Sequence, residues 1–104
     1  MTRGPAPSPW LVVRQSPLAP EDRGVLEALR ALAAEQGARL LEVLLGNASY
    51  EVEGASPGPE GFLLLEEDRR GRGLLVPPGV DARAVSEEEL VHQLFASPKV
   101  IQFP

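Results

Sequence analysis

Short runs rich in apolar residues alternate along this chain with two longer amphipathic stretches. The runs are bounded by glycine, proline or charged residues, which is typical of strands. The pattern predicts strands at 10–13, 38–45, 62–65, 82–85 and 100–103. Because the run at 38–45 is nearly continuous, we expect a central strand that is covered on both faces.

The longer amphipathic stretch predicts a helix over residues 20–36. Pro20 suits the first turn of a helix, and Gly37 suits the left-handed position that ends one. Apolar spacings of three and four predict one buried stripe, formed by Val25, Leu26, Leu29, Leu32, Ala33 and Gln36. Gly24 costs this helix up to about 1 kcal/mol relative to alanine, and close packing is the one reason that the sequence suggests.

The second amphipathic stretch predicts a helix over residues 87–96. Ser86 is an N-cap residue with Glu89 three positions later, which is the pattern of a capping box. Pro98 prevents the helix from continuing. We expect the helix to bury four apolar residues, Leu90, Val91, Leu94 and Phe95.

Residues 48–61 leave two alternatives open. Tyr50 and Val52 alternate with Glu51 and Glu53, which fits either a short strand or a frayed helical turn. The sequence SPGPEG that follows predicts a loop.

The order of these elements predicts the fold class. Strands that alternate with helices are typical of an open sheet with parallel strands and right-handed crossovers. We therefore expect a three-layer α/β/α fold with a mostly parallel sheet of about five strands. It forms a single domain over residues 10–104, preceded by a flexible, proline-rich tail at 1–9.

Composition narrows the possible chemistry. The chain has 104 residues, no cysteine and one histidine, so disulfides, thiolate metal sites and thiol nucleophiles are excluded. Its net charge of −5 makes nonspecific binding to nucleic acid or anionic lipid unexpected. The first residues do not have the pattern of a secretory signal, and no apolar run is long enough to span a bilayer, so we expect a cytoplasmic protein.

The main charged cluster follows the strand at 62–65, where the carboxyl ends of parallel strands place ligand sites. It consists of Glu66, Glu67, Asp68, Arg69, Arg70 and Arg72. The carboxylates are candidates for acid–base chemistry or Mg²⁺ binding, but neighbouring strand residues point to opposite faces, which favours a solvated strand end. The arginines favour a charged surface turn, with a partner or RNA contact as the alternative. The RGRG sequence at 70–73 lacks the strand and helix that a dinucleotide motif needs.

Other polar candidates are weaker. His92 lies off the predicted apolar face of its helix, which indicates a surface position. Ser16 and Ser49 lie near strand ends but have no adjacent base, so they are poor nucleophiles. Trp10 and Phe103 are expected to be core or interface anchors. We therefore predict no catalytic, cofactor-binding or metal-binding residue.

Three segments together carry a resemblance to a known family. The first is the strand at 10–13, followed by Ser16-Pro17 and a helix. The second is LEEDRRGRGL at 65–74, in which Asp68 corresponds to the family's acidic residue and Arg72-Gly73 to its Arg-Gly. Gly79-Val80, the helix from Ser86 and KVIQF at 99–103 follow. In this order and spacing the chain resembles the DsrE/DsrF/DsrH (TusD/TusC/TusB) family of sulfur-relay proteins, nearest to the DsrH/TusB branch.

The resemblance implies a function without catalysis. It implies a short helix after the strand at 62–65, assembly into dimers or hexamers, and a part in tRNA 2-thiouridine synthesis or sulfur oxidation. Family members carry a persulfide on a cysteine, which this chain lacks. The implied role is therefore a structural or docking subunit, in a homo-oligomer or with DsrE/DsrF-like siblings, that receives a sulfur-carrier protein at 66–73.

One segment departs from the family's pattern. Residues 48–61 are too short and too rich in proline for the family's full second helix. The alternative is a small ligand-binding or hydrolytic α/β domain that uses the same strand-end carboxylates and arginines.

Overall fold

The computed structural model describes residues 8–58 and 60–103, so most of the predicted tail at 1–9 lies outside the described residues. The elements in chain order are β1 (Trp10–Arg14), α1 (Pro20–Glu35), β2 (Leu40–Leu44), the 3₁₀ helix η1 (Gly46–Gly54), β3 (Gly61–Leu65), α2 (Glu66–Gly71), β4 (Asp81–Val85), α3 (Glu87–Ala96) and β5 (Val100–Gln102). All five predicted strands and both predicted longer helices are present. The segment after β2, for which the sequence allowed either a strand or a helical turn, forms the 3₁₀ helix η1.

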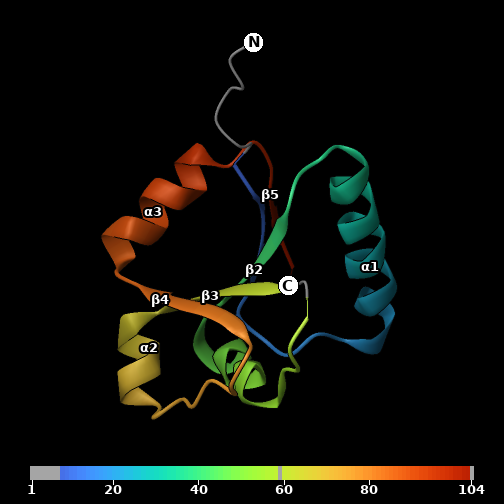
Figure 1. The fold of residues 1–104 in the computed structure, drawn as a ribbon. Coiled ribbons are helices and arrows are strands. Elements are labelled where there is room, and N and C mark those ends of the chain that lie inside the picture. Colours follow the sequence, from blue (N-terminus) through green and yellow to red (C-terminus); the bar gives the residue numbers. More distant parts are fainter. Residues whose placement is uncertain (1–7, 59, 104) are drawn as a thin grey trace.

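The strands form one sheet in the order β4-β3-β2-β1-β5, and every neighbouring pair is parallel. Helices α1 and α3 lie on opposite sides of this sheet (Figure 1). The central strand β2 is buried along most of its length, as its continuous apolar sequence predicts. The predicted three-layer α/β/α class with a parallel five-stranded sheet is therefore confirmed.

Two separate apolar clusters cover the α1 side of the sheet. One joins α1 to the amino-terminal half of the strands through Trp10, Val12 and Leu26. The other joins η1 to β2 and β3 and contains Val52 and Phe62. Trp10 and Phe103 are both buried, so they are core residues.

The opposite side of the sheet has a single covering helix, α3. Leu90 is buried there against Leu11, Val43 and other sheet residues, and Leu94 packs beside them. The prediction that this helix also buries Val91 and Phe95 is wrong, because both are exposed. Residues four apart share one line along a helix, and only the Leu90–Leu94 line of α3 faces the sheet.

The helix ends follow their sequence signals in part. Ser86 Oγ accepts a hydrogen bond of 3.1 Å from the Glu89 amide, but the Glu89 carboxylate pairs with Arg83 instead of completing the capping box. Gly37 has the predicted left-handed conformation, with φ of 71°.

The buried stripe of α1 is narrower than predicted. Leu26 and Ala33 are buried, whereas Val25 and Leu32 are exposed. Close packing does not explain Gly24, because a Cβ atom there would have no neighbour within 4 Å.

Candidate functional site

The predicted charged cluster is largely exposed to solvent, as its residues favoured, but it forms a short helix, α2, in place of a strand end or a turn. The helix that the family resemblance implied is thus confirmed. Three acidic residues occupy the first turn and Arg69 and Arg70 the last, which complements the helix dipole. Glu66 pairs with both arginines, at 2.5 Å to Arg69 and 3.1 Å to Arg70. The carboxylates are therefore arranged around one helical turn, and the argument from opposite strand faces does not apply.

Helix α2 packs beside η1, since each begins where a neighbouring strand ends. The Gly46 amide donates to Asp68 over 3.3 Å, and Arg72 pairs with Asp68 at 3.2 Å. The Arg72 guanidinium also lies 5.2 Å from the centre of the Tyr50 ring. The structure thus places η1 next to the predicted cluster. The sequence did not indicate that η1 would be part of this site.

The charges of α2 are held mainly by one another. Hydrogen bonding to Arg69 lowers the pKa of Glu66, so this carboxyl stays ionised and is a poor general acid. Among the described residues, no three acidic or histidine side chains are grouped to hold a metal ion.

A cationic and an apolar side chain are both strongly exposed in this part of the molecule. Arg70 has 75% of its side chain exposed, and Leu75 is 76% exposed. The Leu75 amide donates to Glu53 of η1, which fixes this residue next to that helix. We call the surface formed by Glu66–Arg72, Tyr50 and Leu75 the strand-end platform.

A second charged site lies inside the molecule, on the α1 side of the sheet. Arg14, the last residue of β1, is 3% exposed and donates to Glu42 of β2 over 2.7 Å and 3.2 Å. It also holds both carboxylate oxygens of Glu51, at 2.7 Å and 3.1 Å. Burial lowers the pKa of Arg14, but the hydrogen bonds that it donates to Glu51 and Glu42, and the attraction of their charges, outweigh burial and raise it.

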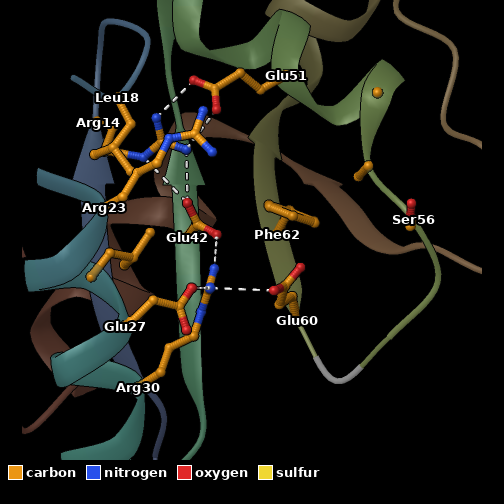
Figure 2. Close-up of a pocket in the computed structure, with 13 residues that line it drawn as sticks. Arg14, Leu18, Arg23, Glu27, Arg30, Glu42, Glu51, Ser56, Glu60 and Phe62 are labelled. Atoms are coloured by element: carbon orange, nitrogen blue, oxygen red, sulfur yellow. Dashed lines mark hydrogen bonds and ion pairs between the residues drawn. The ribbon is translucent and has the colours of Figure 1, made fainter. Parts of the chain in front are cut away.

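Arg30 of α1 extends this network. It pairs with the other oxygen of Glu42 at 2.6 Å, and also with Glu27 at 2.8 Å and Glu60 at 3.2 Å. Glu42 is thus held between two guanidinium groups, as Figure 2 shows. We call Arg14, Glu42, Arg30 and Glu51 the buried ion network.

The network borders a cleft of about 500 Å³ between α1, η1 and the sheet. This volume falls within the range of small-molecule sites, roughly 300–1,000 Å³. Its walls combine charged groups with the apolar side chains of Leu18, Leu26 and Phe62. The cleft also lies between elements of the two apolar clusters that cover this side of the sheet.

The remaining sequence candidates have structural or surface positions. Ser49 is fully buried, and its hydroxyl donates to the Gly46 carbonyl over 2.6 Å, so it serves the turn after β2. His92 is exposed on α3 and Ser16 is exposed after β1. The predicted surface position of His92 is therefore confirmed.

These features define a single-domain α/β protein with a parallel five-stranded sheet, one surface cluster of charges and one buried network beside a cleft. No protein-family model matches this chain, and no curated protein sequence matches it. Its fold is similar to that of the ychN protein from E. coli, with a TM-score of 0.58 and 19% sequence identity, over 91% of this chain and 99% of that one. Within the described residues, no helix has the length and apolar character needed to cross a membrane.

Proposed function

We propose that this protein is a non-catalytic subunit of a DsrE/DsrH-like sulfur-relay assembly. It provides structure and a docking surface for a sulfur-carrying partner in tRNA thiolation or sulfur oxidation. The sequence resemblance and the parallel α/β fold support this role. The lack of any cysteine means that the chain itself carries no persulfide.

The observation that carries the proposal is an apolar surface on the α3 side of the sheet. Phe95 is 88% exposed, and Val91 lies one turn before it with nearly half of its surface exposed. Val100 of the edge strand β5 is also exposed, and its register opposite Leu11 places it on the same side of the sheet. Neighbouring exposed apolar side chains of this size are typical of protein interfaces.

This surface suits a second copy or a sibling of the same fold. An antiparallel pairing of two α3 helices brings Phe95 of one subunit toward Val91 of the other.

The strand-end platform remains available to the sulfur carrier. The platform lies at one edge of the sheet, beyond the carboxyl ends of β2 and β3. Phe95 lies elsewhere, on the helix that covers one face of the sheet. Arg70 and Leu75 offer a cationic and an apolar contact there, which suits a partner with an acidic and apolar surface.

Sedimentation velocity of the purified protein tests the assembly. We expect an oligomer, alone or with a cysteine-bearing DsrE/DsrF-like sibling, and we expect Phe95→Asp to dissociate it. Leu75→Asp is the matched control, because it places the same charge on the platform and should leave the oligomer intact. The proposal is contradicted if the wild-type chain stays monomeric at all concentrations and does not bind the sibling.

A further inference from the structure

The cleft beside the buried ion network has a chemistry that the subunit role does not use. Stability gives little reason for such a network, because an apolar pair of similar volume is often at least as stabilising as a buried ion pair. Here Arg14 occupies the last position of β1 and Glu42 the middle of β2, in strands whose other residues are apolar and mostly buried. The free-energy cost of burying these charges is explained if the network holds the walls of a binding site in place.

The inner part of the network is saturated. The Arg14 guanidinium contacts Glu42, Glu51 and the Ser16 carbonyl, and no buried side-chain nitrogen or oxygen in the described part of the chain lacks a partner. Glu42 and Arg14 therefore form the rigid floor of the cleft. A ligand must be recognised by the groups that surround them.

The surrounding groups offer one cation and one carboxylate. Arg23 lines the cleft and forms no ion pair with another described residue. Arg14 holds both carboxylate oxygens of Glu51, whereas Glu60 pairs with Arg30 through one oxygen and keeps 41% of its side chain exposed. Figure 2 shows Arg23 on the α1 side of the cleft and Glu60 with Phe62 on the facing wall.

The balance of charge decides which ligand fits. Three arginines and four glutamates line the cleft, so its walls carry a slight negative excess and do not favour a dianion such as phosphate. A ligand with one carboxylate and one ammonium group matches both kinds of free group. The apolar side chains of Leu18, Leu26 and Phe62 provide room for a hydrocarbon side chain.

The geometry points to a binding site for a small zwitterion of the amino-acid type. Its carboxylate pairs with Arg23, and its ammonium group pairs with the exposed carboxylate of Glu60. The side chain of the ligand lies against Phe62. This site is separate from the platform and from the α3 surface, so it does not depend on the subunit role.

The test is a titration of the full-length protein with three compounds of one carbon skeleton, followed by NMR chemical shifts. The compounds are L-leucine, isocaproate, which lacks the ammonium group, and isoamylamine, which lacks the carboxylate. We expect leucine to bind and to shift the amide signals of Arg23 and Glu60. We expect each singly charged analogue to bind at least about tenfold more weakly, because it loses a charge-assisted pair.

Two variants assign the contacts. Arg23→Gln should weaken leucine at least about tenfold and leave isoamylamine unchanged, whereas Glu60→Gln should weaken both compounds that carry an ammonium group. Arg70→Gln on the distant platform is the matched control and should change nothing. Equal binding of leucine and isoamylamine, or no binding of any compound at millimolar concentration, would overturn the proposal.

Discussion

The two charged regions of this molecule are built from the same residue types and differ in their relation to water. On α2, Glu66 pairs with Arg69 and Arg70 in the solvent. Between β1, β2 and α1, Glu42 pairs with Arg14 and Arg30 beneath the surface, and its side chain is 5% exposed. Exposed ion pairs contribute little to folding, whereas a buried pair leaves an uncompensated charge when one partner is removed. The difference shows that burial, and not the presence of ion pairs, distinguishes a structural network from a charged surface.

Removing one partner of the buried ion network is the change with the largest expected effect. Arg14→Leu removes one of the two cations that hold the buried Glu42, and we expect it to lower the free energy of unfolding by about 3–5 kcal/mol in urea titrations. The double variant Arg14→Met, Glu42→Leu should recover most of this loss, because no charge is then left buried. Equal destabilisation by the double variant would show that packing, and not uncompensated charge, causes the loss.

A change in α1 separates the network from the helix that carries Arg30. Gly24→Ala should raise the free energy of unfolding by up to about 1 kcal/mol, since alanine favours the helix and the added Cβ meets no atom within 4 Å. Measured together with Arg14→Leu, the gain should be additive. A gain that disappears in the Arg14→Leu background would indicate that loss of the network unravels α1.

The exposed cluster should respond much less. Arg69→Gln removes the stronger partner of Glu66 but leaves both groups in water, so we expect no measurable change in urea unfolding at neutral pH. A loss comparable to that of Arg14→Leu would contradict the division into a buried network and a solvated platform.

The smallest expected effect is on the pH dependence of stability in the acid range. Arg69 and Arg70 lower the pKa of Glu66 in the folded protein, so the stability that this carboxylate adds is present above its ordinary pKa. It is lost as the pH falls through the lowered pKa of the folded state. Urea titrations through the acid range should therefore show a slightly flatter pH dependence for Glu66→Gln than for the wild type. Identical profiles would show that the pair is not formed in solution.

The sequence predicted the parts of the molecule whose signals are local. The apolar runs located all five strands, and Ser86 located the start of α3 with its cap. The cluster at 66–72 was visible because its residues are neighbours in the chain. Its helical form was not visible from charge alone, because six residues are too few to show a helical period.

The buried ion network was not predicted, because its four members come from four separate elements. Arg14 and Glu42 are 28 residues apart, and each looks like the polar end or an interruption of a strand. A signal was nevertheless present, since a charged residue inside a run that is buried on both faces needs an opposite charge. The exposure of Phe95 was missed for a related reason, as the helical period does not say how wide a face the sheet will cover.

Reconstitution with a sulfur carrier tests the central claim most directly. The purified chain is mixed with a DsrE/DsrF-like sibling and a carrier loaded with labelled persulfide sulfur, and the complex is analysed by native mass spectrometry. The account predicts one complex that contains all three proteins, with the label on sibling or carrier cysteines and none on this chain. A chain that remains outside the complex, and whose presence changes no sulfur transfer, would contradict it.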